Sequence, residues 1–315
     1  MSEINLHFFR CFDSLRVEWT PGVNLIIGAN AQGKTSILEA ICCLLRLQSP
    51  RTSTLADAVK LEHPLLSLQG VFSDTHLRFD YPPRSIALDG KSQSRAGDYL
   101  KTGLVTWFSN DDMALIRAGS TGRRRYLDFI CSQLDPSYLP HLRAYDRALR
   151  SRNFLLKQSR PSRQQIDAWN TPLQESGEPI LAARAKVLLA LTPHVKASSE
   201  EISGGPEEVH IAFQPGVEGN FKTALEASAD EEIRMRSTII GPHRDDFRIS
   251  LFNKDAASFA SEGQQRTIAL ALKLAQVHVI HSETKRMPIL LIDDIFGELD
   301  PERRNRLMSV LPSSA

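Results

Sequence analysis

The chain has 315 residues, a formal net charge of +1, and 42% hydrophobic and 24% charged residues, which is ordinary for one large or two moderate globular domains. No apolar run reaches the roughly 18 residues that a membrane span needs, and Glu3, Arg10 and Asp13 occupy the place where a secretion signal would be apolar. The four cysteines have no zinc-like spacing, and adjacent Cys42 and Cys43 on an apolar helix are predicted core residues, so we expect a reducing cytoplasm.

The first motif follows a short apolar segment. Residues 23–27 (VNLII) predict a buried strand, residues 28–35 (GANAQGKT) fit the pattern G-x-x-x-x-G-K-[ST], and residues 36–47 predict a helix. This context predicts a phosphate-binding loop in which backbone N–H groups and Lys34 meet the phosphates and Thr35 offers its hydroxyl to Mg²⁺. The predicted nucleotide-binding residues here are Gly28, Ala29, Asn30, Ala31, Gln32, Gly33, Lys34, Thr35 and Ser36.

Positive charge is concentrated in residues 117–160, which hold ten Arg or Lys against three Asp and predict helices at 123–134 and about 137–158. Arg143, Arg147 and Arg150 recur at helical spacing, with an apolar stripe of leucines at 142, 149 and 156. We predict that these arginines bind DNA through its backbone, independently of sequence, because no aromatic residues are interleaved. The alternatives are a solvated helix face and, for the arginines at 123–125, internal ion pairs.

A second anion-binding motif comes before a predicted helix at about 265–281. Ser261, Glu262, Gly263 and Gln264 form a Ser-x-Gly turn, which at a helix N-terminus predicts an anion site. The simpler interpretation is an N-cap by Ser261. Beside the other motifs we prefer the anion site, completed in trans by the phosphate loop of a second copy.

Two carboxylates follow a run of aliphatic residues. Residues 289–292 after Pro288 predict a buried parallel strand. At its end, Asp293 is predicted to hold Mg²⁺ and Asp294 to accept a proton from the attacking water. The alternative is a strand end with solvated acids. Residues 297–300 (GELD) resemble the loop that crosses to the partner subunit in ABC-type ATPases, which implies this role for Glu298 and Asp300.

The chain resembles the RecF family of bacterial replication and recombination-repair ATPases, relatives of the SMC and ABC proteins, over nearly its whole length. The resemblance is carried by residues 28–39, 49–52 (SPRT), 123–128 (RRRYLD), 241–246 (GPHRDD), 261–267 (SEGQQRT) and 293–300. The runs at 241–246 and 263–267 are more specific than the phosphate loop. Residues 108–112 (FSNDD) depart from the family's usual FSPED at a loop that senses the γ-phosphate. The resemblance also implies that Arg51 binds the nucleotide.

The resemblance implies ATP and Mg²⁺ as cofactors, a homodimer formed on ATP binding, and partners among DNA, single-stranded DNA included, and other recombination mediators. It implies a function in DNA replication, repair of single-stranded gaps and SOS induction. Asp294 stands where many ABC-type ATPases have the longer Glu, which predicts hydrolysis slow enough for ATP to act as a switch. Competing classes are a kinase or hydrolase, and an ATPase of a transporter or another DNA-maintenance complex. The signature motif, which is the Ser-x-Gly turn at residues 261–264, and the crossing loop at 297–300 disfavour a kinase. The basic helices and residues 241–246 disfavour a transporter.

The implied fold is an α/β P-loop ATPase head of ABC/SMC type with a mixed sheet core, an antiparallel β subdomain and a helical insertion. We expect residues 1–112 to be the first part of the head, 113–205 the helical insertion (lobe II) and 206–315 the second part of the head, shortened at its C-terminus. Alternating runs at 4–12, 65–72, 77–81 and 209–213 predict the antiparallel sheet.

The end of the chain gives one more expectation. In the fold that the chain resembles, the helix at 301–311 is followed by a strand in the middle of the parallel sheet, between residues 26–27 and 290–292. This chain stops at Ala315, so we expect a C-terminally shortened form. In it, those two segments should be separated by a gap or pair directly.

Overall fold

The computed structural model describes residues 1–311, which form two compact units. One unit comprises residues 1–111 and the chain from residue 280 onward, and the other comprises residues 112–279. Residues 206–279, which the sequence assigned to the ATPase head, thus group with the helices of 113–205. Within the part of the chain that the structure describes, no helix is long and apolar enough to cross a membrane.

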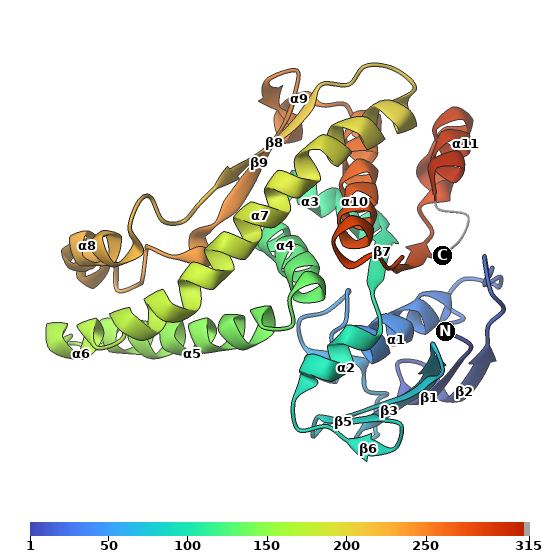
Figure 1. Cartoon of the computed structure of the whole chain (residues 1–315), viewed down its shortest axis with the longest axis horizontal. Helices are drawn as coiled ribbons and strands as arrows, with labels where there is room; N and C mark the ends of the chain where they lie inside the picture. Colours follow the sequence, from blue (N-terminus) through green and yellow to red (C-terminus); the bar gives the residue numbers. More distant parts are fainter. Residues whose placement is uncertain (312–315) are drawn as a thin grey trace. The chain divides into compact units, whose positions relative to one another are not determined.

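The first unit contains a six-stranded antiparallel sheet of order β2-β1-β3-β4-β5-β6 (Figure 1). Alternation places Ile4 and Leu6 of β1 in the core while Glu3 and Asn5 are half-buried. The predicted runs at 4–12, 65–72 and 77–81 all lie in this sheet. Its strands are β1 (Glu3–Phe9), β2 (Phe12–Glu18), β3 (Leu66–Phe72), β4 (Thr75–Tyr81), β5 (Ser85–Leu88) and β6 (Lys91–Ser92).

Helix α1 (Lys34–Arg46) packs on the antiparallel sheet and on a separate two-stranded parallel sheet. Cys42 and Cys43 of α1 are fully buried, as predicted. The parallel sheet pairs β7 (Val105–Ser109) with β11 (Ile289–Asp293). Its parallel direction is as predicted, but only Leu291 of β11 is buried. The unit also contains α2 (Ala96–Thr102), α11 (Pro301–Val310) and 3-10 turns at Leu55–Ala58 and Phe296–Glu298.

The predicted strand at residues 23–27 is wrong: the segment forms no strand, and Val23, Leu25 and Ile27 are 78%, 81% and 89% exposed. A strand needs a neighbour to take its backbone hydrogen bonds, and within residues 1–311 the only strand beside β11 is β7. Asn24 instead bonds locally, accepting from the Thr20 N–H at 3.1 Å and donating to the Thr20 carbonyl at 2.8 Å. Within the described residues the segment does not pair with β11, so the direct pairing that we considered is not observed. Residues 312–315 lie outside the described residues.

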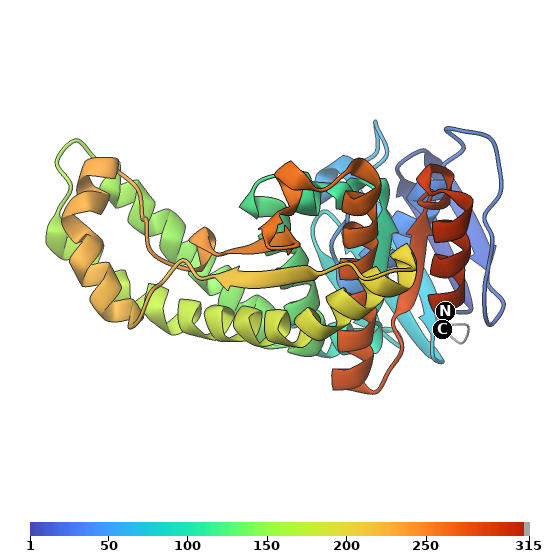
Figure 2. The ribbon, with the colours of Figure 1, turned by 90° about the horizontal axis from the view of Figure 1, so that it is seen from above.

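The second unit is mainly helical, with a small antiparallel sheet of order β10-β9-β8. The run predicted at 209–213 is β8, which pairs with β9 rather than with the sheet of the first unit. Helices α5 and α7 run side by side (Figures 1 and 2). The elements are α3 (Ala114–Arg117), α4 (Ser120–Leu134), α5 (Tyr138–Leu156), α6 (Arg163–Asp167), α7 (Asn170–Ser203), β8 (Val209–Gln214), α8 (Phe221–Met235), β9 (Asp246–Leu251), β10 (Lys254–Asp255), α9 (Ala256–Phe259) and α10 (Glu262–Thr284), the last of which continues into the first unit.

Buried ion pairs fix these helices to one another. Arg184 of α7 lies 2.8 Å from Asp128 of α4 and 2.7 Å from Asp245. Arg152 of α5 pairs with Glu232 of α8 at 2.6 Å, with both side chains fully buried. Removing one partner would leave an uncompensated buried charge, so these pairs specify how the unit packs.

Candidate functional site

The phosphate loop leads directly into α1. Gly33 has φ +84° and comes just before Lys34, the first residue of the helix. A Cβ at Gly33 would lie 2.5 Å from a ring carbon of Phe12 and 2.7 Å from Sγ of Cys11, so space as well as φ requires glycine. The Lys34 Nζ donates to the carbonyls of Gly28 and Ala29, each at 2.8 Å. The ammonium thus lies over an exposed loop, where a phosphate could replace neutral acceptors with a charge-assisted bond.

Thr35 brings the phosphate loop to the carboxylate strand. Its hydroxyl donates to Asp293 Oδ1 at 2.8 Å, although the two residues are 258 positions apart. Hydroxyl and carboxylate oxygens are ligands that Mg²⁺ prefers, and the pair therefore fits this ion. In residues 1–311 no group of three or more His, Cys, Asp or Glu could hold a metal. Magnesium would consequently also depend on water and phosphate oxygens at this place.

Asp294 follows β11 in a left-handed conformation with φ +50°, and it is exposed. The Asn110 amide donates to the Asp294 carbonyl at 3.2 Å and to Glu298 Oε1 at 3.4 Å. Asn110 is the position at which the chain departs from the proline usual in the family, and a proline side chain could not donate these bonds. The sequence analysis identified this difference from the family but did not predict that Asn110 links Asp294 to Glu298 of the crossing loop.

The two predicted crossing-loop residues have different surroundings. Asp300 caps α11 by accepting from the Arg303 N–H at 2.9 Å, and this bond lowers the pKa of Asp300. Glu298 is exposed and accepts from Asn110.

Arg51 is held by an acid that the sequence did not single out. Glu39 of α1 is fully buried and accepts from Arg51 at 3.1 Å, from Arg10 at 2.5 Å and from the Ser49 hydroxyl at 2.6 Å. The Arg51 side chain is still 40% exposed, so this anchor leaves part of the guanidinium available to a ligand. A lone acid among the apolar residues of α1 was the signal that could have indicated Glu39.

The signature motif lies at the start of α10. The Ser261 hydroxyl accepts from the Gln264 N–H at 3.3 Å, and Gln264 Oε1 accepts from the Ser261 N–H at 3.0 Å, which is a capping box. The N-cap interpretation therefore describes the local structure, and the anion site stays a prediction. Next to it, buried Gln265 accepts from Arg117 at 2.6 Å and donates to the Ala260 carbonyl at 3.0 Å, which fixes the first turn.

The arginines of the basic segment fall into two groups. Arg143, Arg147 and Arg150 are exposed on α5. Arg123 instead forms a bidentate pair with Asp246, at 2.6 and 2.9 Å, and Arg124 donates to the Asp245 carbonyl at 2.9 Å. The alternative of an internal ion pair is correct for Arg123. Arg124 has internal hydrogen bonds to a backbone carbonyl and to hydroxyls instead, and Arg125 is exposed.

Comparisons with known proteins decide the family. A family model described as an AAA domain matches residues 3–74. The DNA replication and repair protein RecF of Lachnoclostridium phytofermentans is 32% identical over 98% of this chain and 89% of its own length, and that of Symbiobacterium thermophilum is 35% identical over 99% and 88%. The chain belongs to the RecF family.

Solved structures agree with this assignment. A RecF–ATP structure, described as a recombination mediator of the RecFOR pathway, has a TM-score of 0.89 and 31% identity over 99% of this chain and 90% of that one. An SMC head bound to a winged-helix domain of ScpA has a TM-score of 0.51 at 16% identity over 99% of this chain and 85% of that one, which shows the shared fold alone. The predicted ABC/SMC-like P-loop fold is confirmed.

The GPHRDD run of this RecF-family chain lies in the second unit, with Gly241, Pro242 and Asp245 buried and Arg244 exposed. Asp245 is fully buried and accepts from the Gly216 N–H at 2.7 Å as well as from Arg184. The Nε2–H of His243 donates to the Thr238 carbonyl at 2.9 Å, so its Nδ1 accepts the Tyr145 hydroxyl at 2.6 Å. Burial lowers the pKa of His243 to about 4, which keeps the ring neutral.

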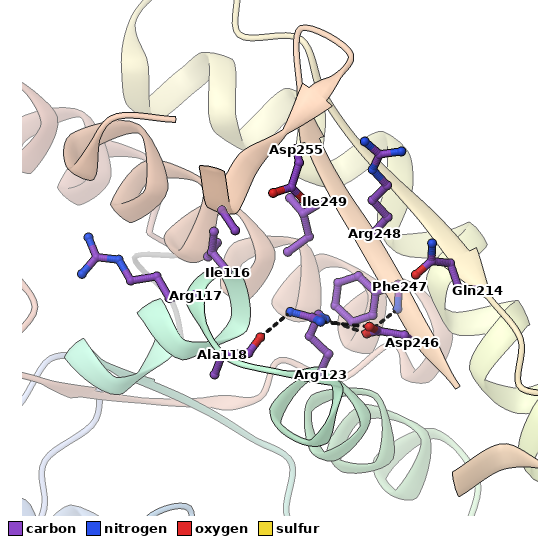
Figure 3. Close-up of a pocket in the computed structure, with 11 residues that line it drawn as sticks. Ile116, Arg117, Ala118, Arg123, Gln214, Asp246, Phe247, Arg248, Ile249 and Asp255 are labelled. Atoms are coloured by element: carbon purple, nitrogen blue, oxygen red, sulfur yellow. Dashed lines mark hydrogen bonds and ion pairs between the residues drawn. The ribbon is translucent and has the colours of Figure 1, made fainter. Parts of the chain in front are cut away.

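A pocket of about 430 Å³ opens beside this run, between β9 and the α3–α4 connection (Figure 3). Arg123 lies near its centre and bonds to Asp246 and to the Ala118 carbonyl at 2.8 Å. The Asp255 carboxylate caps α9 by accepting from the Ser258 N–H, and Arg117 donates to the side chain of Gln265. Because most of the charged side chains that line the pocket already have partners, we interpret them as supporting the GPHRDD run rather than as ligand-binding groups.

Proposed function

We propose that this chain is an ATP-controlled DNA-binding factor of bacterial DNA replication and recombinational repair. The observation that carries the proposal is the 2.8 Å bond from Thr35 to Asp293, which brings a phosphate loop and a carboxylate strand together inside one unit. The relatives' names, DNA replication and repair protein RecF, support the biological setting.

The residues of the first unit suit the binding of ATP with Mg²⁺. Lys34 would exchange its carbonyl partners for phosphate oxygens, and the helix N-terminus behind it would add its positive dipole end. Thr35 and Asp293 would hold Mg²⁺, whose charge would stabilise the phosphates when bound. Asp294 would accept a proton from water. Asn110 would position Asp294 by donating to its backbone carbonyl.

We further propose that two copies join on ATP. Ser261 and the following residues would bind the nucleotide of the partner copy, and the Glu298–Asp300 loop would cross to it. Slow hydrolysis would then time how long the dimer stays on DNA.

The exposed arginines of α5 are the proposed DNA surface. Their partners would be phosphates, so binding should be independent of sequence and weaken steeply with salt. Gap repair, SOS induction, other recombination mediators as partners and a cytoplasmic setting belong to the same proposal.

The experiment that tests the function is DNA binding with and without ATP. Fluorescence anisotropy of labelled DNA with the full chain, Mg²⁺ and either ATP or no nucleotide should give much tighter binding with ATP. Lys34→Arg, which keeps only weak nucleotide binding, should lose this difference. Equal affinity in both conditions, or no DNA binding, contradicts the proposal.

A further inference from the structure

An aromatic side chain, Phe154, lies within the row of cations on α5, so the expectation that no aromatic residue is interleaved there is wrong. Arg143, Arg147, Arg150, Phe154 and Lys157 follow one another at spacings of four, three, four and three residues, which places them on one face of the helix. All five are exposed, and Phe154 has 67% of its surface open to solvent. Lys157 is the residue that ends the helix. Phe154 therefore has a cation about one turn away on each side.

Packing of the helix does not account for Phe154. The core face of α5 is formed by Tyr145, Ala148, Arg152 and Leu156, all buried. At 100° per residue, Phe154 points away from that face. An isolated exposed apolar residue needs no explanation, but an exposed phenyl ring in line with four cations is a specific arrangement.

The helix is held rigidly at this point. Asn153 accepts from the Thr238 N–H and hydroxyl, each at 2.8 Å. Arg152 donates to the Thr238 hydroxyl at 2.9 Å and pairs with buried Glu232. The residues just before Phe154 are thus bonded to the end of α8 and to the turn that follows it. The backbone that carries the ring is therefore held in place, and little conformational freedom would be lost when the ring binds a flat ligand.

We propose that Phe154 stacks on an unpaired base of a DNA strand whose phosphates lie along Arg147, Arg150 and Lys157. This inference rests on the proposed function and adds a residue that distinguishes single-stranded from duplex DNA at the same surface. Aromatic rings beside a cationic track bind single strands by stacking, because every base has a π-face. A duplex keeps its bases stacked on one another and offers the ring only backbone.

The charges favour a nucleic acid over an acidic, apolar peptide. Within residues 1–311, Arg143, Arg147 and Lys157 form no ion pair, while Asp146, one turn before Arg150, is the acidic side chain that borders the row. An apolar peptide anchor would need a contiguous apolar patch, whereas the residues flanking Phe154 on this row are cations. The surroundings of Phe154 therefore favour a nucleic acid as its ligand.

The experiment compares Phe154→Ala with the wild-type chain, with ATP and Mg²⁺ present, on a labelled oligothymidylate and on a duplex of the same length. We expect the variant to lose about 5- to 100-fold in affinity for the single strand and less than about twofold for the duplex. Phe154→Trp should restore single-strand binding, whereas Phe154→Leu should not. Leu189→Ala, which removes a 77% exposed apolar side chain from α7, is the matched control and should change neither affinity.

The salt dependence separates stacking from charge. Phe154→Ala should leave the slope of log affinity against log salt unchanged on the single strand, whereas Arg147→Ala should reduce it by about 0.7. Unchanged single-strand affinity in Phe154→Ala would overturn the inference while the proposed function stands. Equal losses on both DNAs would also overturn it. A wild-type chain that binds no DNA overturns both.

Discussion

At the scale of single residues, the nucleotide site depends on the conformation of two aspartates. Asp293 ends β11 and holds the Thr35 hydroxyl, while Asp294 turns out of the strand at φ +50°. Asp is among the few non-glycine types that adopt this conformation readily. A longer Glu, the residue that many ABC-type ATPases have here, would reach the water differently. The shorter Asp294 is one reason to expect slow turnover.

Replacing Asp294 by Asn should separate binding from hydrolysis. The amide keeps the size and the backbone preference of Asp but cannot accept the proton, so kcat should fall by about 10²- to 10⁴-fold. ATP affinity should change little, because Lys34 and Thr35 remain. Single-turnover hydrolysis and nucleotide titrations measure the two quantities. Wild-type turnover above about 10 s⁻¹, the median for enzymes, would contradict the slow-hydrolysis proposal.

His243 makes the second unit sensitive to acid. Its folded pKa of about 4 lies below the unfolded value of about 6.5. The unfolded chain therefore binds this proton first, and the stability from neutral His243 is present above pH 6.5 and lost as pH falls toward 4. Between pH 7 and pH 5 the loss should be about 2 kcal/mol of unfolding free energy.

His243→Gln supplies the comparison, because glutamine does not titrate. Urea unfolding at pH 7 and pH 5 should show that the wild-type chain loses about 2 kcal/mol more than the variant. The same pH dependence in both chains would mean that groups other than His243 account for the acid sensitivity. Asp245 would not be one of them, because burial raises its pKa and a raised carboxyl pKa adds stability as pH falls.

At the scale of elements, α5 has two faces with different roles. Tyr145, Arg152 and Leu156 are buried on one face, and Arg143, Arg147 and Arg150 are exposed on the other. Because the exposed arginines support no packing, their removal should leave the fold intact and act on binding alone.

Changing Arg143, Arg147 and Arg150 together to Ala should weaken binding to all DNA sequences alike. If each contacts one phosphate, the slope of log affinity against log salt should fall by about 2 to 3 on duplex DNA. Replacing Lys196, Lys222 and Arg234, which are exposed elsewhere in the same unit, removes the same charge and is the control. Equal losses in the two variants would mean that only net charge matters.

At the scale of the whole molecule, the motifs are divided between the two units. The phosphate loop and the carboxylate strand belong to the first unit, and Ser261 belongs to the second. The proposed function joins them through a second copy, so ATP should control the oligomeric state.

Light scattering of the full chain should give a dimer with ATP and a monomer without nucleotide. Ser261→Arg should bind ATP yet remain a monomer, because its bulk and charge alter the anion site. Since Ser261 also caps α10, its loss costs about 1 kcal/mol of stability. Ser261→Thr keeps the capping hydroxyl and serves as the control. A wild-type monomer at micromolar concentration with saturating ATP would rule out the shared site.

Local sequence determined the features that depend on neighbouring residues. The phosphate loop, the helices at 123–134, 137–158 and 265–281, the alternating strands and the family resemblance all follow from short-range patterns. The sequence also placed Arg143, Arg147 and Arg150 on one helix face, because helical spacing fixes direction whatever the rest of the fold does.

Only the tertiary structure decided which groups meet across the chain. Apolar residues 23–27 satisfied a strand pattern but have no neighbouring strand to pair with. Arg123 and Arg124 satisfied a basic pattern, yet their partners Asp246 and Asp245 lie more than 120 positions away. Glu39 was recognised only because it holds Arg51, and Asn110 only because it bonds to Asp294. Phe154 was recognised only because its side chain is exposed beside the cations of α5. Pairing and burial depend on contacts distant in sequence, and periodicity along one segment cannot reveal them.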